Sequence, residues 1–261
     1  MPYSRIKTLI RDPYAIYARH VLRLRPLDPL RPEADPRLRG VVLHEIMEGF
    51  VRDRAATRDD LLRIADQVLA DRVAWPLARA IWRSRIEKAA DAFLAFSVGT
   101  GGDPALLEKK GAARLDGLEF TLTGKPDRID RLTDGRLLVI DYKTGDPPSK
   151  AEQEHFDKQL LLAAAMAERG AFPGLDPGEV ARVAYVGVKA DFKLVENALQ
   201  AGEVDAVWDK FATLIARYLR ATQGYTARRA MKTVKDPSDF DHLSRFGEWD
   251  MTAKAVPEVL E

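Results

Sequence analysis

The sequence predicts an α/β fold with a mixed central sheet, and three features of the chain carry this prediction. Apolar residues recur at helical spacing over residues 38–96, and the spacing changes to a period of two from Leu118 to Thr123. Asp116–Gly117 and Asp134–Gly135 are dipeptides that favour tight turns between antiparallel strands. Further along, a helical pattern, a β-branched run and another helical pattern follow in the order of a parallel crossover. We therefore expect an antiparallel meander joined through a helix to one more strand.

The N-terminal part of the chain is expected to be helical. Ser4 and the pair Asp12–Pro13 suit helix starts, because Ser and Asp side chains accept hydrogen bonds from free N–H groups and Pro fits the first turn. Residues 25–36 contain Pro26, Pro29, Pro32 and Pro36, and each lacks an N–H. We therefore expect an extended linker there. Three longer helices are then predicted, from Leu38 to about Arg54, from Asp59–Asp60 onward, and after Trp75–Pro76.

The strands are predicted to follow the helices. Consecutive strands are expected at residues 106–115, 118–124, 126–132 and 136–142, as a meander of three or four strands. Beyond Pro147–Pro148 we expect a helix over 150–169, a strand over 180–188 and a helix over 204–220, while the tail after Gly224 shows no assignable pattern. We interpret residues 1–261 as a single domain. Its parts are a mainly helical segment (1–104), a catalytic core (105–190), and a C-terminal helix with a tail (191–261).

Composition excludes several classes of protein and of site. The 41 Lys plus Arg residues nearly balance 40 Asp plus Glu, and a formal net charge of +1 does not indicate a nucleic-acid or membrane partner. The absence of Cys excludes disulfides, iron–sulfur clusters and Cys-ligated zinc, so a metal would need oxygen or histidine ligands. No apolar run approaches the ~20 residues of a membrane-spanning helix, and the first residues lack a signal-peptide pattern. We expect a cytoplasmic location without a membrane partner.

Acidic residues lie on two neighbouring predicted strands. Asp127 is near the start of one strand, and Asp141 ends the next strand after four apolar residues. If these strands pair around the Asp134–Gly135 turn, the two carboxylates converge, and carboxylate oxygens are preferred ligands of Mg²⁺ and Mn²⁺. Lys143 shares a strand face with Asp141, so its ammonium can orient or deprotonate a water. An exposed ion pair at a hairpin end is the alternative, but the apolar run before Asp141 favours a buried strand whose charges need partners.

These residues resemble the PD-(D/E)xK nucleases, and within them the RecB-like exonuclease branch. The resemblance lies in Gly124–Asp130, which reads Gly-Lys-Pro-Asp-Arg-Ile-Asp, and in the Asp141–Gly145 segment, Asp-Tyr-Lys-Thr-Gly. It implies a restriction-endonuclease-like core. It also implies that Asp127, Asp141 and the backbone carbonyl of Tyr142 bind Mg²⁺ or Mn²⁺, and that Lys143 serves the attacking water.

Flanking residues extend the resemblance. Gly40–Glu48 is similar to the helical motif of the branch, whose His is a further metal ligand, which makes His44 the candidate here; a structural His is the alternative. Gln159 matches a Gln that orients DNA or water in the family, although an exposed polar residue would look the same. Glu48, Arg128 and Asp130 are candidates for supporting positions around the metal, with Glu48 one helical turn after His44.

The two ends of the chain resemble the C-terminal nuclease domain of AddB, a subunit of the AddAB helicase-nuclease of double-strand break repair. The similar segments are Ile10–Arg19 and His242–Trp249. Many relatives carry a Cys ligand of an iron–sulfur cluster where this chain has Asp12, so no such cluster is expected. The resemblance implies DNA and an AddA-type helicase-nuclease subunit as partners, with the chain as part of a longer AddB-type subunit. A stand-alone relative is the alternative.

Local charge indicates where DNA would bind. Residues 1–44 carry nine Lys plus Arg against four Asp plus Glu, and residues 214–235 carry six basic residues and no acidic residue. Phosphate contacts need such patches, and single strands also stack on aromatic rings. The candidates for DNA binding are Arg19, Arg228, Arg229, Lys232 and Tyr225. A solvated helix face is the alternative for the C-terminal run.

Taken together, the motifs predict a metal-dependent DNA exonuclease acting in recombinational repair. Its catalytic residues are expected to be Asp127, Asp141, Lys143 and Gln159. Three alternatives remain open. The alternatives to this exonuclease are a catalytically silent DNA-binding or assembly module of the same fold, a structure-selective endonuclease, and a Cas4-like exonuclease. The absence of Cys weighs against the last of these.

Overall fold

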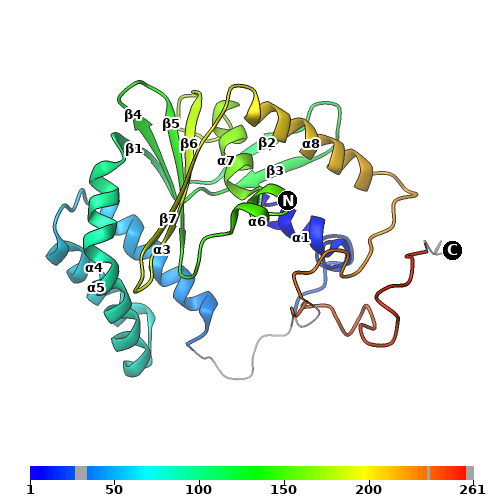
Figure 1. Cartoon of the computed structure of the whole chain (residues 1–261), viewed down its shortest axis with the longest axis horizontal. Coiled ribbons are helices and arrows are strands. Elements are labelled where there is room, and N and C mark those ends of the chain that lie inside the picture. The colour runs from blue at the N-terminus through cyan, green and yellow to red at the C-terminus, as the bar shows by residue number, and fades with distance from the viewer. Residues whose placement is uncertain (27–33, 234–235, 257–261) are drawn as a thin grey trace.

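The computed structural model describes residues 1–26, 34–233 and 236–256. Within these residues five strands form one mixed sheet in the order β1–β4–β5–β6–β7 (Figure 1). The strands are β1 (Gly102–Leu107), β4 (Arg128–Leu132), β5 (Leu137–Lys143), β6 (Val180–Gly187) and β7 (Lys193–Ala198). β5 and β6 run parallel, and all other neighbours are antiparallel. This is the mixed α/β, restriction-endonuclease-like architecture that the sequence predicts.

Helices cover both faces of the sheet. On one side lie α3 (Pro36–Arg52), α4 (Arg58–Arg72) and α5 (Pro76–Gly99), and on the other lie α7 (Gln159–Glu168) and α8 (Glu203–Tyr218) (Figure 1). Side chains of β5 alternate between the two layers, because successive residues of a strand face opposite ways. Leu137 and Val139 join the core beneath α7 and α8, and Leu138, Ile140 and Tyr142 join the core beneath α3 to α5. β5 is therefore the buried centre of the molecule, and its end is a rigid platform for polar groups.

The N-terminal helices begin close to the predicted positions. Four short helical segments occupy the first residues: η1 (Tyr3–Arg5), α1 (Ile6–Arg11), α2 (Pro13–Ile16) and the π-helical η2 (Tyr17–Val21). α3 begins at Pro36, two residues before the expected Leu38, because Asp35 caps it by accepting from the N–H of Leu38 at 2.7 Å. Of the predicted linker, residues 27–33 lie outside the described residues.

The predicted run of consecutive strands is wrong at its beginning. The expected strand over 106–115 is two strands in different sheets, β1 and β2 (Gly111–Arg114), and β2 pairs only with β3 (Thr121–Gly124) in a separate two-stranded sheet. β1 instead pairs with β4, which lies some twenty residues further along the chain. The chain leaves the main sheet because Glu108 adopts a left-handed backbone conformation with φ of 46°, which ends β1. The main sheet extends over residues 102–198, beyond both ends of the segment 105–190.

The crossover from β5 to β6 contains two helices where the periodicity predicts one. α6 (Lys150–His155) starts with a capping box between Ser149 and Glu152, and α7 follows after a break at residues 156–158. The break occurs because Asp157 turns inward and accepts a hydrogen bond from the hydroxyl of Tyr185 at 2.7 Å. The expected strand at 180–188 and helix at 204–220 are present as β6 and α8, and the unpredicted β7 lies between them.

The C-terminal tail returns to the N-terminal helices (Figure 1). The carboxylate of Asp12 accepts hydrogen bonds from the backbone N–H of Arg228 at 3.0 Å and from the hydroxyl of Ser238 at 2.6 Å. Phe240 is buried against Ala15 and Ala18. These contacts hold the two ends of the chain together. Among the described helices, none combines the length and the apolar character needed to cross a membrane.

Candidate active site

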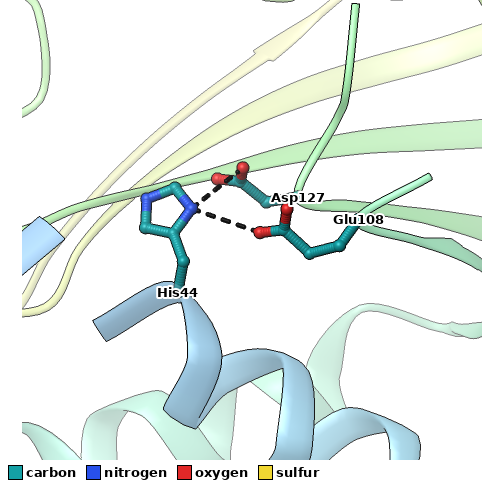
Figure 2. A group of neighbouring side chains, drawn as sticks. All are labelled: His44, Glu108 and Asp127. Atoms are coloured by element: carbon teal, nitrogen blue, oxygen red, sulfur yellow. Dashed lines mark hydrogen bonds and ion pairs between the residues drawn. The ribbon is translucent and has the colours of Figure 1, made fainter. Parts of the chain in front are cut away.

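Polar side chains from four segments meet at the edge of the sheet where β5 ends. β4 and β5 are antiparallel, with Arg128 opposite Ile140, so the start of β4 and the end of β5 lie at the same edge. Asp127 directly precedes β4, and Asp141 and Lys143 are the last polar residues of β5. His44 reaches this edge from the middle of α3, and Glu108 reaches it from the residue after β1 (Figure 2).

Three of these side chains form a compact cluster. Nδ1 of His44 lies 3.1 Å from Oδ1 of Asp127 and 3.3 Å from Oε1 of Glu108 (Figure 2). One nitrogen or oxygen from each residue lies within 4.8 Å of the others. The N–H of Tyr142 donates to Oδ2 of Asp127 at 2.7 Å, and the carbonyl of Tyr142 lies 3.1 Å from Nε2 of His44. The main chain of β5 thus fixes both Asp127 and the imidazole.

Glu108 is the member of this cluster that the sequence analysis missed. Its side chain is 10% exposed, and Oε2 forms an ion pair with Nζ of Lys125 at 2.5 Å. Its N–H donates to the carbonyl of Asp127 at 3.2 Å, so β1 carries it directly to the start of β4. A left-handed conformation at a residue other than Gly costs about 1 kcal/mol or more and occurs preferentially at functional sites. The only signal for Glu108 in the sequence is its place directly after the apolar residues that end a strand, much as Asp141 follows the apolar residues of β5.

A second group of polar side chains lies beside the cluster. Oδ2 of Asp141 lies 2.6 Å from Nζ of Lys143, and the side-chain amide of Gln159 donates to Oδ1 of Asp141. Oε1 of Gln159 is 3.5 Å from the same Nζ. Lys143 also lies over the ring of Tyr185, with Nζ 5.5 Å from the ring centroid. The crossover helix α7 therefore contributes Gln159, at its first residue, to the end of β5.

The cluster favours the protonated form of His44. Burial by itself lowers the pKa of His44, but hydrogen bonds to the carboxylates of Asp127 and Glu108 outweigh burial and raise it to about 10. Burial raises the pKa of Glu108, and its bonds to His44 and Lys125 more than reverse this, so the net pKa is lowered. The imidazolium thus neutralises part of the negative charge that the two carboxylates bring together.

The second group also has shifted pKa values. Burial raises the pKa of Asp141, and the nearby charge of Asp127 raises it further, against the opposing effect of Lys143. Burial lowers the pKa of Lys143, but the carboxylates around it, first that of Asp141, produce a net rise. Lys143 is therefore an ammonium at neutral pH. Two buried carboxylates at one edge repel each other, and a bound cation would relieve that repulsion.

The donor set fits a hard divalent cation. His44, Glu108 and Asp127 supply one imidazole nitrogen and carboxylate oxygens, and the chain has no thiolate to offer a softer metal. Carboxylate oxygens with few nitrogen ligands suit Mg²⁺ or Mn²⁺. The absence of Cys also means that no iron–sulfur cluster is bound through Cys ligands.

Three further predicted residues lie outside the cluster. Arg128 and Asp130, both on β4, form a buried ion pair. Nε lies 2.5 Å from Oδ1 and Nη2 lies 2.6 Å from Oδ2. Nη1 of Arg128 donates to the hydroxyl of Ser97 on α5 at 3.1 Å, so the pair ties β4 to a helix. Glu48 lies with His44 in the wall of a cavity of about 780 Å³ between α3 and α4. Its carboxylate is 3.6 Å from the guanidinium of Arg52.

The predicted DNA-binding residues have different environments. Arg229 is exposed, and Lys232 is exposed with its ammonium 3.5 Å from Glu152. Arg228 is an internal residue instead: it is 5% exposed, its guanidinium donates to both carboxylate oxygens of Asp241, and it lies over the ring of Phe246.

The last two candidates, Tyr225 and Arg19, also take part in internal contacts. The ring of Tyr225 packs against Tyr17 and Tyr218, and its hydroxyl donates to the carbonyl of Tyr218. Tyr225 is therefore a partly buried member of a group of three tyrosine rings. Arg19 forms an ion pair with Asp239 at 2.7 Å and remains partly exposed.

Comparison with known proteins identifies the family. An uncharacterized protein of Rickettsia bellii is 28% identical over 64% of this chain, and an uncharacterized protein of Rickettsia felis is 25% identical over 71% of it. The alignments cover 21% and 23% of those proteins, so the chain spans about a fifth of the length of these curated relatives. The crystal structure of SSO0001 aligns with 82% of this chain and 75% of its own at 14% identity, with a TM-score of 0.34.

A model of the PD-(D/E)XK nuclease superfamily matches residues 1–237, which include every residue of the cluster and of the group around Lys143. Nucleases of this superfamily use divalent metals, in agreement with the donors found here. The chain belongs to the PD-(D/E)XK nuclease superfamily.

Proposed function

We propose that this chain hydrolyses phosphodiester bonds of DNA with the help of Mg²⁺ or Mn²⁺. The observation that carries the proposal is the convergence of His44, Glu108 and Asp127 beside the pair Asp141–Lys143. A cluster of hard donors next to a fixed ammonium suits an anionic substrate, because the ammonium attracts the phosphate that a metal also binds.

The side chains have separate roles in this proposal. His44, Glu108 and Asp127 would hold the cation, with Asp141 and the carbonyl of Tyr142 as further oxygen donors. When bound, the cation supplies a water of lowered pKa and stabilises charge on the scissile phosphate.

Lys143 works through its position, not by taking a proton. Its raised pKa keeps it an ammonium, so it donates hydrogen bonds that orient a water or a phosphate oxygen. Gln159 holds Asp141 in place through its amide, and its carbonyl oxygen faces the same ammonium. The reaction needs no covalent intermediate with the protein in this arrangement.

The narrower assignment is an exonuclease domain of an AddB-type subunit that works beside an AddA-type helicase-nuclease in double-strand break repair. It is supported by the resemblance of both chain ends and by the contacts of Asp12 with the tail, which join those ends. In this assignment the neighbouring subunit unwinds DNA and delivers a strand to the site.

The test is cleavage of end-labelled single-stranded and duplex DNA by the whole chain, with Mg²⁺, Mn²⁺ or EDTA. The informative variant is Lys143→Ala, and Lys210→Ala, an exposed lysine of α8, is the matched control. We expect cleavage that requires the metal, falls by about 10²-fold or more in Lys143→Ala and is unchanged in Lys210→Ala. A branched DNA substrate in the same assay separates an exonuclease from a structure-selective endonuclease.

Two results would count against the proposal. Equal cleavage by wild type and Lys143→Ala would show that this edge of the sheet is not the active site. DNA binding by the wild type without cleavage under any metal condition would favour the silent binding module.

A further inference from the structure

A second cavity, of about 270 Å³, lies between the N-terminal helices and the C-terminal tail. Its helix side carries four basic side chains, Arg5, Lys7, Arg11 and Arg19, and its tail side includes Ser238 and Asp239. We call it the α1 groove. Its lining has two carboxylates against four basic side chains, whereas the larger cavity between α3 and α4 has five carboxylates against four. The α1 groove is thus the cationic one of these two cavities.

The basic groups of the α1 groove are incompletely neutralised. Among the described residues, the guanidinium of Arg5 has no hydrogen-bond or ion-pair partner. Burial lowers the pKa of Arg5, and the positive charge of Arg19 lowers it further. Asp239 opposes these effects, and Arg37 adds a smaller lowering. Three guanidiniums from η1, η2 and α3 therefore repel one another here. An anion bound between them would remove that repulsion.

Arg11 shows the same shortage of acceptors. Its Nε is buried, and within the described part of the chain it has no hydrogen-bond partner. The nearest carboxylate, that of Glu152, is 3.7 Å from Nη2, which is an ion pair without a close hydrogen bond. The guanidinium lies over the ring of Phe156, with Cζ 4.4 Å from the ring centroid. A buried donor without an acceptor is costly, and an incoming anion could supply the acceptor.

The α1 groove borders the group around Lys143. Nζ of Lys7, in its wall, is 3.1 Å from Oδ2 of Asp157. Oδ1 of Asp157 accepts from the hydroxyl of Tyr185, and Lys143 lies over the ring of Tyr185. The cationic cavity is therefore separated from Lys143 by two side chains only.

We propose that the α1 groove binds the phosphate backbone of the single DNA strand whose end lies at the His44–Glu108–Asp127 cluster. Arg5, Arg11 and Arg19 contact its phosphates. This inference rests on the proposed function for the identity of its ligand. The cavity volume is that of a single small ligand, so it accepts one or two backbone units of one strand and not a double helix. Guanidiniums suit this ligand, because each can donate two parallel hydrogen bonds to the oxygens of a phosphate.

The test measures binding separately from cleavage. Fluorescence anisotropy with a labelled oligothymidylate of twenty nucleotides, in EDTA, gives the affinity of the whole chain at several salt concentrations. Arg5→Ala is the main variant, because Arg5 has no partner whose loss would unfold the chain, and Arg5→Glu is the second. Arg114→Ala is the control, since Arg114 of β2 is exposed and lines neither cavity. Thermal unfolding of each variant checks that it is folded.

We expect weaker binding and a weaker dependence on salt. For single strands log K falls with log[salt] by about 0.7 for each phosphate contacted, so Arg5→Ala should reduce the slope by about 0.7. The combined variant Arg5→Ala with Arg19→Ala should reduce it by about 1.4. Arg5→Glu should weaken binding more than Arg5→Ala, and Arg114→Ala should match the wild type.

Either of two results would overturn the inference. One is wild-type affinity and slope in folded Arg5→Ala and Arg5→Glu. The other is a wild type that binds duplex DNA more tightly than the single strand, together with an Arg5→Ala variant that loses at least as much affinity for the duplex as for the single strand. Cleavage distinguishes this failure from failure of the proposed function. A wild type that cleaves DNA while Arg5 variants bind normally refutes only the groove, and a wild type that binds through Arg5 yet cleaves nothing refutes only the nuclease.

Discussion

Asp130→Ala should destabilise the fold severely through the charge that it leaves behind. Asp130 is fully buried, and the guanidinium of Arg128 beside it is 2% exposed. Two hydrogen bonds of 2.5 and 2.6 Å join the pair, and Ser97 accepts one more N–H of Arg128. After the substitution Arg128 remains in the interior without the two bonds to Asp130.

The size of the effect follows from this geometry. Removal of one partner of a buried ion pair costs about 3–5 kcal/mol, because the remaining charge is uncompensated. Domains are stable by about 5–15 kcal/mol, so the substitution consumes a large part of the free energy of unfolding. For a chain of this size a loss of that magnitude lowers the melting temperature by roughly 10 °C. Asp127, directly before Arg128, would lose its fixed position as well.

Urea unfolding of wild type and variant, followed by circular dichroism, measures the free energy difference. Asp134→Ala is the matched control, since Asp134 and Arg136 have the same spacing but an exposed ion pair at 2.8 Å. The double variant Asp130→Leu with Arg128→Met should be much more stable than Asp130→Ala, because it buries no charge. A loss in Asp130→Ala no larger than in Asp134→Ala would refute the reasoning.

Three further predictions concern the cluster and the tail. Glu108→Gln keeps the shape but loses the charge, so Mg²⁺ or Mn²⁺ affinity should fall about tenfold or more in calorimetry, with Glu119→Gln on the surface as control. The pKa of His44 is about 10, so metal binding at pH 7 should release one proton; affinity should rise about tenfold per pH unit, and buffers of different ionisation enthalpy report that proton. Asp12→Ala should release the tail by removing the acceptor of Arg228 and Ser238, which faster proteolysis after residue 224 would reveal.

Each of these has a contrary outcome. Unchanged metal affinity in Glu108→Gln would place the cation away from this cluster. Metal binding without proton release would mean that His44 is not a ligand. Proteolysis of the tail at the wild-type rate in Asp12→Ala would show that apolar contacts such as those of Phe240 suffice to hold it.

The sequence by itself determined the sheet edge that carries the acids. The period of two, the apolar run before Asp141 and the turn at Asp134–Gly135 are local features, and they predict β4, β5 and their pairing. Asp127 and Lys143 follow from them, because strand alternation and hairpin geometry leave little freedom once the pairing is known. His44 and Gln159 required a resemblance as well, since a single polar residue on a helix has no local pattern that distinguishes it.

Only the tertiary structure decided which groups complete the site. Glu108 joins the cluster because β1 pairs with β4, although β2 and β3 lie between them in the sequence. No local pattern encodes that pairing. Arg228 and Tyr225 make internal contacts, although the basic composition of their segment favours an exposed DNA-binding surface. The α1 groove likewise exists only where the tail meets α1, more than two hundred residues apart in sequence. Local periodicity specifies elements, whereas burial and charge pairing depend on which distant elements pack together.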